Sequence, residues 1–576
     1  MTAPDPDATP VADSQTRGTA ARVPDRLVRS TAVLAVGTLV SRLTGLLRWV
    51  AAAYAMGATA SRLADSYQFA NTAPNQLYEL ALGGILTSVL VPLFVDALAN
   101  KAERDAWRDV ANVFWTTLVA GTLASLVLVF AAPLVLRLTA VGLQGQDFDL
   151  AVALLRMFAF QILFYALNAL CGAVLNARRH FAVPAFTPVL NNVITIGVYL
   201  WFAAALSGPP TTDLASPLVW LLGIGTTAGV AAMAVANLPA LRHRAHLRFH
   251  IDLRAPILRR LFALSVWTVL YVVTNQVGLV VIQRITSRQQ GAYAAWNYAL
   301  LFFQLPNGLF AVSVVTALLP SLAERWALRD IDGMKQRLGE GLRLVAFLVL
   351  PAAIALGMLS YPIIAVFFGY GNFDSSDIAL VSKVLTLFAV GLVPFTLFML
   401  ALRTFYAMKD TRTPFFVNLV ATAVAIALYV VLSGPMGVYG VALGYALSYL
   451  VAAILAWALL HRRLGRLLSR GDTRTIGRIL IACVPFTLVM LAVVVFNRVV
   501  NSGSSLVWFV VEVLIGTLVG LVTYIGFARL VGVDEVGHLR ALLRRRRKVD
   551  APPDATQLPD ARGAGTGAGS EGGTAP

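Results

Sequence analysis

The stretch Val110–Leu136, VANVFWTTLVAGTLASLVLVFAAPLVL, contains no charged residue from one end to the other. An α-helix rises about 1.5 Å per residue, so about 20 apolar residues cross the hydrocarbon layer of a bilayer. A loop carrying Lys101, Arg104 and Arg108 precedes this stretch. About fourteen comparable stretches follow one another along the chain, and they predict an all-α polytopic membrane protein with 14 transmembrane helices.

Lysine and arginine are concentrated in every second connection between these stretches. Because cytoplasmic loops collect basic residues, this alternation predicts that both termini are cytoplasmic. Roughly 36 of the 46 basic residues lie on the crowded side, against about seven on the other. The crowded side comprises Arg17 to Arg29, Lys101 to Arg108, Arg178 and Arg179, Arg242 to Arg260, Arg325 to Arg343, Arg403 to Arg412, Arg462 to Arg478, and Arg540 to Lys548.

The composition excludes several classes of protein. A hydrophobic fraction of 58% and a charged fraction of 13% are not those of a soluble domain. The net charge of +17 is spread over all the inner loops, so it does not indicate nucleic-acid binding. Cys171 and Cys483 lie in apolar stretches, and the histidines lack carboxylate or cysteine partners at ligand spacing. No nucleotide-binding or nucleophile motif occurs, so we expect a transport-class protein with no metal, no cofactor and no catalytic residues.

An internal repeat organises the chain. Pro74-Asn75 in the second span matches Pro306-Asn307 in the eighth, and Thr187-Pro188 with Asn192 matches Thr413-Pro414 with Asn418. Both copies start from the cytoplasm, which predicts two parallel six-helix repeats related by an axis along the membrane normal. The expected domains are a disordered tail 1–30, an N-lobe 31–240, a C-lobe 257–460, a last pair of helices 476–530, and a basic, then disordered tail 531–576.

Charged residues inside the spans are candidate site residues, because each needs a partner or water. In the first span Ser41, Gly45 and Arg48 share one helical face, and Arg48 is too deep to reach the inner surface. Such a polar stripe with a cation suits an anionic substrate. The second span holds Glu79, for which an internal ion pair with Arg48 is the expectation.

The motif Ser41-Arg42-Leu43-Thr44-Gly45-Leu46-Leu47-Arg48 resembles the first helix of the MurJ (MviN-type) family in the MOP exporter superfamily. The resemblance continues at further motifs from about Arg29 to Leu530. These are Asp65-Ser66-Tyr67, Pro74-Asn75, Val91-Pro92, Leu175-Asn176, Pro184 to Pro188, Gln304 to Gly308, Leu318 to Leu322, Tyr370-Gly371 and Thr413-Pro414.

The resemblance implies two MATE-like lobes that alternate access around a cationic cavity in the bacterial plasma membrane. It also implies that the last two helices form a groove for a lipid tail. Such proteins move lipid II, the undecaprenyl-pyrophosphate-linked peptidoglycan precursor, to the outer leaflet. Arg42 and Arg48 match cavity arginines, Asp65 a cavity aspartate, and Asn75 the asparagine of the Pro-Asn motif. Together with Ser41, Gln304 and Asn307, these are the expected substrate-binding residues.

This sequence departs from the family pattern at several positions. Trp49 stands where an acid is common, and Tyr78 and Leu301 stand where the family has arginines. Glu79 replaces a common base, and Gln304 replaces a glutamate. The cavity therefore has about two cations fewer than the pattern, and Arg284 or Arg288 are the candidates to replace part of that charge.

The sequence leaves two other functions open. The chain could export another lipid-linked glycan or a small amphiphile. It could instead be a membrane scaffold that recruits cell-wall synthesis or division proteins through its basic inner loops. Cavity substitutions would be silent in a scaffold, whereas deletion of Arg540 to Lys548 would not.

Overall fold

The computed structural model describes residues 25–80, 90–100, 102–178, 180–208, 210, 213–214, 216–242, 247–500 and 505–537. These residues form α-helices with short π-helical turns, and no β-strand occurs among them. The expected tails 1–30 and 531–576 fall mostly outside this description. Helix α1 nevertheless begins at Asp25, and residues up to 537 are described after α19.

The first group of helices, which we call the N-lobe, is built from the first half of the chain. Apolar runs form its long helices, and α1 and α7 pack along each other over much of their length. Its elements are α1 (Asp25–Met56), α2 (Leu63–Tyr78), α3 (Val91–Asn100), α4 (Glu103–Thr139), α5 (Gly145–Phe158), α6 (Gln161–Ala177), α7 (Ala182–Ala205), α8 (Pro217–Val235) and α9 (Leu238–Arg242).

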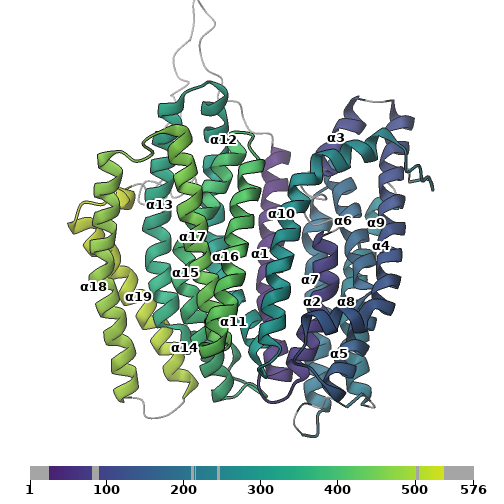
Figure 1. Ribbon diagram of the computed structural model, residues 1–576, viewed down its shortest axis with the longest axis horizontal. Helices are drawn as coiled ribbons and strands as arrows, with labels where there is room; N and C mark the ends of the chain where they lie inside the picture. The colour runs from purple at the N-terminus through teal and green to yellow at the C-terminus, as the bar shows by residue number, and fades with distance from the viewer. Residues whose placement is uncertain are drawn as a thin grey trace, which may run out of the picture.

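The second group, which we call the C-lobe, repeats this arrangement and is followed by two more helices. The C-lobe comprises α10 (Pro256–Thr286), α11 (Ala292–Pro306), η3 (Asn307–Ala311), α12 (Val312–Ala327), α13 (Ile331–Met358), α14 (Ser360–Phe368), α15 (Ser375–Ala407), α16 (Arg412–Met436) and α17 (Val438–Leu464). The appended pair is α18 (Arg470–Val500) and α19 (Leu506–Leu530). In Figure 1 the two lobes stand side by side, and α1 of the N-lobe and α10 of the C-lobe lie at their boundary.

Eleven helices in the described part of the chain are long and apolar enough to cross a membrane. The other three expected spans are α1, the α2–α3 segment and the run α11–η3–α12. The last two are interrupted close to Pro74 and Pro306, whose rings remove a backbone donor and disturb the helical ladder. After Pro306 the chain continues as the π-helix η3, a local widening that often accompanies functional sites.

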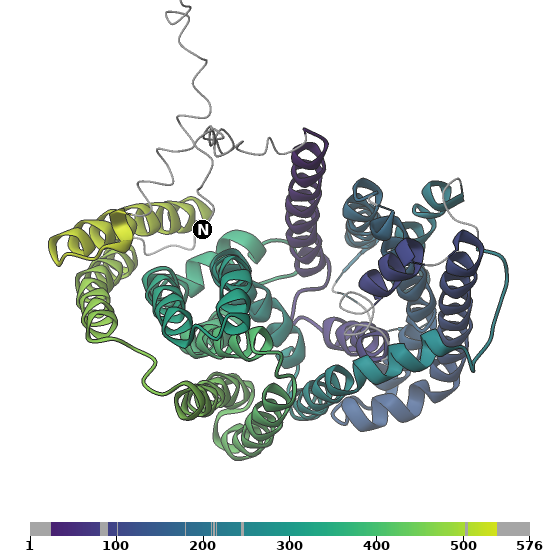
Figure 2. The same cartoon turned by 90° about the horizontal axis from the view of Figure 1, so that it is seen from above.

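The lobes contact each other mainly at the outer end, which holds residues 57–62, 140–145, 287–291 and 369–377. Gly57 and Gly291 both have positive φ, and a Cβ on Gly57 would lie 2.3 Å from the carbonyl oxygen of Asn372. Only glycine permits this approach of one lobe's backbone to the other. Figure 2 shows the lobes from above, with α1 standing between them.

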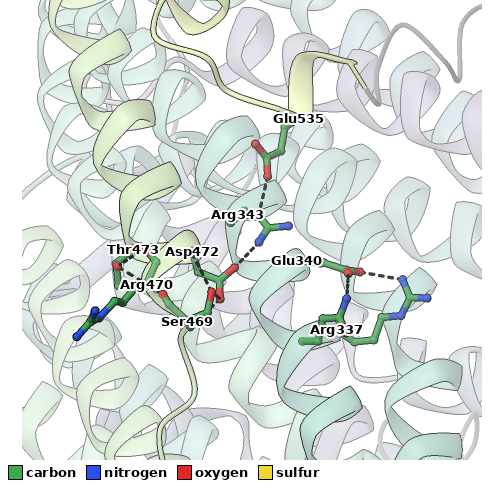
Figure 3. Close-up of polar contacts among 9 residues, drawn as sticks. Arg337, Glu340, Arg343, Ser469, Arg470, Asp472, Thr473 and Glu535 are labelled. Atoms are coloured by element: carbon green, nitrogen blue, oxygen red, sulfur yellow. Dashed lines mark hydrogen bonds and ion pairs between the residues drawn. The ribbon is translucent and has the colours of Figure 1, made fainter.

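An ionic cluster on the cytoplasmic side attaches the last two helices to the C-lobe. Arg343 of α13 donates from Nε to Glu535, which follows α19, at 2.8 Å and from Nη1 to Asp472 of α18. Ser469 caps the start of α18 by accepting from the Asp472 backbone N–H at 3.1 Å, and it donates in turn to the Asp472 carboxylate. Figure 3 shows Arg343 between the two carboxylates, so one guanidinium joins three segments of the chain.

Candidate functional site

The outer end of the lobe interface is closed by a carboxylate on the C-lobe. Asp377, in the first turn of α15, is fully buried and accepts from the backbone N–H groups of Ala58 at 2.8 Å and Thr59 at 2.7 Å. It also accepts from the Thr59 hydroxyl. Nearby, Asn372 donates to the carbonyl oxygens of Tyr54 and Ala55 at the end of α1.

Asp65 closes the same end from the N-lobe side. Its buried carboxylate accepts from the backbone N–H groups of Gly291 at 2.7 Å and Ala294 at 3.0 Å, and so caps α11 of the opposite lobe. Arg62 lies 3.8 Å from it. In this conformation Asp65 therefore joins the lobes, rather than facing an open cavity as its family position suggested.

A chain of polar side chains lies just inside this closure. Gln76 of α2 donates to Gln283 of α10 at 3.4 Å, Gln283 donates to the Tyr293 hydroxyl at 3.0 Å, and Tyr293 donates to Thr72 at 3.1 Å. The first and last of these bonds cross between the lobes, and the middle one lies within the C-lobe. The outer path is closed by hydrogen bonds, which can break and re-form when the lobes move.

Arg48 lies toward the outer end of α1, about 12 Å from the helix end at Met56. It interacts electrostatically with the hydroxyls of Tyr67, Tyr165 and Tyr199. Tyr199 donates to Tyr67 at 2.9 Å, and Tyr67 bonds Thr226. No carboxylate of the described residues lies within ion-pair distance of Arg48.

The surroundings of Glu79 differ from those expected from the sequence. The ion pair expected between Glu79 and Arg48 is absent from the described structure, and the Glu79 side chain is exposed at the lobe boundary. Glu79 follows the last turn of α2, whereas Arg48 interacts electrostatically with Tyr67 near the start of that helix. In the described structure Glu79 and Arg48 therefore do not neutralise each other as an ion pair.

Arg42, two turns below Arg48, extends across to the C-lobe. A Cβ placed on Gly308 of η3 would lie 2.9 Å from Nη1 of Arg42. Among the residues described, none forms an ion pair with this guanidinium, and its side chain is exposed. Arg42 thus brings a positive charge beside Asn307-Gly308, a contact that only the tertiary structure reveals.

The stripe of Ser41 and Gly45 faces α7 for part of its length. Asn192 donates to the Ser41 carbonyl oxygen at 3.2 Å and to the Thr44 hydroxyl at 3.0 Å. The missing side chain of Gly45 leaves room for Asn192, whose Nδ2 would lie 3.7 Å from a Cβ there. In this conformation the stripe packs α1 against α7 inside the N-lobe.

Asn75, Gln304 and Asn307 lie at different places around the lobe boundary. Asn75 donates to the Asn71 carbonyl oxygen at 2.9 Å and hydrogen-bonds Tyr165. Gln304 and Asn307 line a cavity of about 560 Å³ in the C-lobe, with Glu79 at its N-lobe side. The cavity is walled by aromatic rings and amides from α10, α11, α15, α16 and α17.

The residues at the departures from the family pattern have other contacts. Tyr78 packs against Tyr165 with ring centroids 5.4 Å apart, and Trp49 contacts Tyr298 of α11 edge to face. Arg284 donates to the Leu138 carbonyl oxygen at the outer end at 3.2 Å, and Arg288 is exposed there. Neither of these two arginines lines the C-lobe cavity, so they do not replace the missing cations there.

Sequence reasoning missed Asp377, the tyrosine cluster around Arg48, and Asn418 as a cavity residue. Asp377 follows a turn sequence at the start of an apolar span, which reads as an ordinary helix cap. Asn418 was visible as the repeat partner of Asn192, but nothing in the sequence said that it faces a cavity. The described residues contain no group of three or more His, Cys, Asp or Glu that could hold a metal ion.

The known proteins that this chain resembles in sequence belong to one family. The family model described as "Lipid II flippase MurJ" matches residues 52–516. A probable lipid II flippase MurJ of Rhizobium tropici is 29% identical over 91% of this chain and 98% of its own length. The lipid II flippase MurJ of Burkholderia cenocepacia is 32% identical over 66% of this chain and 72% of its own length.

Solved structures share the fold. A lipid II flippase MurJ in an inward closed conformation has a TM-score of 0.69 at 23% identity, covering 86% of this chain and 99% of that structure. An inward-facing MATE-family transporter of the MOP superfamily has a TM-score of 0.63 at 14% identity, covering 76% of this chain and 98% of that structure. At these identities the likeness shows a common architecture.

Proposed function

The chain belongs to the lipid II flippase MurJ family, and we propose that it moves lipid II from the inner to the outer leaflet of the bacterial plasma membrane by alternating access. It is a multi-pass membrane protein with the two-lobe architecture of its superfamily. In this proposal the headgroup crosses between the lobes while the lipid tail stays in the bilayer or against α18 and α19.

One observation carries the proposal: α1 holds two arginines without a counter-ion among the described residues, Arg42 beside Gly308 of the C-lobe and Arg48 near N-lobe tyrosines. A cation inside a membrane-spanning bundle is costly unless a partner or water compensates it. A diphosphate supplies two negative charges and several acceptor oxygens, and a guanidinium binds such oxygens in a bidentate way. Arg42 and Arg48 are therefore assigned to the diphosphate.

The closed outer end supports the direction of transport. Asp65, Asp377 and the glutamine–tyrosine chain hold the lobes together there. A headgroup arriving from the inner leaflet would meet the arginines before this closure. Rocking of one lobe against the other, as in other transporters built from repeats, would then break the outer hydrogen bonds and expose the headgroup outside.

The amides at the lobe boundary would hold the uncharged part of the headgroup. Asn75 lies near the tyrosines of the N-lobe, and Gln304 and Asn307 lie in the C-lobe cavity. Ser41 would become available if α1 moved relative to α7. These assignments place the diphosphate at α1 of the N-lobe, and the neutral part of the headgroup at Asn75 and at the C-lobe cavity.

The test is reconstitution of the purified protein in liposomes with fluorescent lipid II on one leaflet, and measurement of its transfer. Arg48→Ala is expected to slow transfer at least tenfold, and Arg48→Lys to retain part of it because the charge remains. Arg156→Ala is the matched control, since Arg156 lies on α5 in a separate groove of the N-lobe.

Transfer at the unmodified rate by Arg48→Ala, with normal membrane insertion, would refute the proposal. Transfer of a different undecaprenyl-linked glycan but not of lipid II would change the substrate. If the protein were a scaffold, neither substitution would affect cell-wall synthesis in cells.

A further inference from the structure

Two pairs of repeat-related asparagines have opposite environments in the two lobes. Asn192 of α7 and Asn418 of α16 follow matching Thr-Pro dipeptides. Asn192 uses its Nδ2 donor twice, on the Ser41 carbonyl oxygen and the Thr44 hydroxyl. Asn418 is 5% exposed, and its Nδ2 has no acceptor in the described part of the chain.

The Pro-Asn pair shows the same contrast. Asn75 donates to a carbonyl oxygen of its own helix and bonds Tyr165. Asn307 has a buried Oδ1 without a donor among the residues that the structure describes. A buried amide left without partners is costly, so a native protein usually supplies one from a ligand or water.

Asn307 and Asn418 line the same C-lobe cavity. Its volume of about 560 Å³ lies within the range of about 300–1,000 Å³ that is usual for ligand sites. Amides and hydroxyls are distributed around it, from Asn275, Gln304, Thr422 and Ser448. The unsatisfied donor of Asn418 and the unsatisfied acceptor of Asn307 make it suited to a ligand that both donates and accepts hydrogen bonds.

The walls of the cavity are aromatic. Trp296 contacts Tyr445 edge to face with centroids 5.3 Å apart, and Tyr445 contacts Tyr449 at 4.9 Å. Tyr429 and Phe303 complete this side. Rings of this kind combine an apolar face with a polar hydroxyl, so they suit a ligand with flat apolar faces and many hydroxyls.

The charge of the cavity excludes the diphosphate from it. None of its lining residues is a lysine or arginine, and Glu79 is the charged residue among them. A carboxylate at the mouth repels an anion. The positive charge of Arg42 lies just outside, beside Gly308, which adjoins the cavity residue Asn307.

We propose that the C-lobe cavity is the glycan subsite of the transported headgroup. This inference rests on the function proposed above. A diphosphate held by Arg42 places its attached sugar at Asn307, and the sugar then extends toward Asn418 between the aromatic rings. Glu79 fixes the orientation, because it repels the diphosphate toward the arginines of α1. The headgroup is thus recognised by charge on one lobe and by neutral polar contacts on the other.

The experiment compares two lipids that differ only in the glycan and its peptide. Binding of lipid II and of undecaprenyl diphosphate, which has no sugar, is measured with the full-length protein in lipid nanodiscs. Asn418→Leu is expected to weaken lipid II binding about tenfold and to leave undecaprenyl diphosphate binding unchanged. Asn418→Ala, which creates space without bulk, should behave in the same way.

Asn192→Leu is the matched control, because it alters the repeat-related amide outside the cavity. It should leave the ratio of the two affinities unchanged. Arg48→Ala should weaken both lipids, and Glu79→Gln should strengthen the binding of undecaprenyl diphosphate alone. Thermal unfolding of each variant identifies any change that comes from a loss of folded protein.

Equal effects of Asn418→Leu on both lipids, or no effect on either, would overturn the glycan subsite. So would equal affinity of the unmodified protein for the two lipids. If the unmodified protein bound neither lipid, the proposed function would fall, and the glycan subsite with it. If both lipids bound but the ratio of their affinities did not change in Asn418→Leu, only the glycan subsite would be refuted, and the flippase proposal would remain.

Discussion

The N-lobe and the C-lobe repeat one helical unit, but their interiors carry different chemistry. On the N-lobe side α1 carries two arginines, of which Arg42 reaches the boundary, and the amides Asn75 and Asn192 are hydrogen-bonded. On the C-lobe side the corresponding Asn307 and Asn418 keep unsatisfied atoms in a cavity without cations. Duplication therefore preserved the positions of the amides, while the neighbouring side chains decided which of them remain available.

The comparison assumes that the lobes move as separate bodies, and a crosslink between them tests this with the largest expected effect. The hydroxyl oxygens of Thr59 and Ser376 lie 3.1 Å apart across the outer closure. The double variant Thr59→Cys and Ser376→Cys, with Cys171 and Cys483 replaced, should form a disulfide and stop lipid transfer. Reduction should restore transfer. Unchanged transfer by the oxidised protein would show that this interface does not open.

Weakening the contacts that close the outer end should shift the protein measurably toward the outward-open state. Asp377→Ala removes a carboxylate that accepts from Ala58 and Thr59, at a cost of about 2 kcal/mol to the closed state. This corresponds to a shift of about thirtyfold toward the outward-open state. The measurement is the labelling rate of Thr72→Cys by an impermeant maleimide from outside. Asp374→Ala is the control, because Asp374 caps its own helix.

The contrast between the amides predicts opposite effects on stability. Asn192→Leu removes two hydrogen bonds inside the N-lobe and should lower the free energy of unfolding by about 1–2 kcal/mol. Asn418→Leu removes a buried donor without an acceptor in the described structure, and should be neutral or stabilising. Thermal unfolding in detergent measures both. Equal destabilisation would mean that Asn418 is satisfied in the folded protein.

The smallest expected effect concerns the cytoplasmic start of α16, where the C-lobe has Asp410 and the N-lobe repeat has Pro184. Burial alone would raise the pKa of Asp410, but hydrogen bonds from Thr413 and Arg463 outweigh it and lower that pKa. The stabilisation is therefore present above the unfolded value of about 3.9 and is lost as the pH falls through the lower folded value. Asp410→Asn should destabilise by about 0.5 kcal/mol at pH 7, and the difference should shrink below about pH 4. A constant difference across this range would refute the assignment.

Much of the architecture could be predicted from the chain, because apolar length and basic loops are local signals. Eleven of the fourteen expected spans are helices long and apolar enough to cross a membrane in the described part of the chain, and the polytopic all-α fold agrees with the solved relatives. Pro74 and Pro306 also marked the places where helices change geometry. Asp65 was predicted to bind the substrate, and in this conformation its partners are backbone N–H groups of the other lobe.

The site was less accessible to sequence reasoning, because its contacts join residues far apart in the chain. The approach of Arg42 to Gly308, the bonds of Asp377 to the end of α1, and the separation of Glu79 from Arg48 all depend on how the lobes dock. Neither helical periodicity nor the repeat contains that information.

The sequence by itself determined which segments enter the bilayer, which way they point and that they are duplicated, since hydrophobic length and loop charge act residue by residue along the chain. The tertiary structure alone decided which polar groups form hydrogen bonds within the protein and which remain available to a ligand. That outcome depends on the neighbours that each side chain meets across helices and across lobes, as the different fates of Asn192 and Asn418 show.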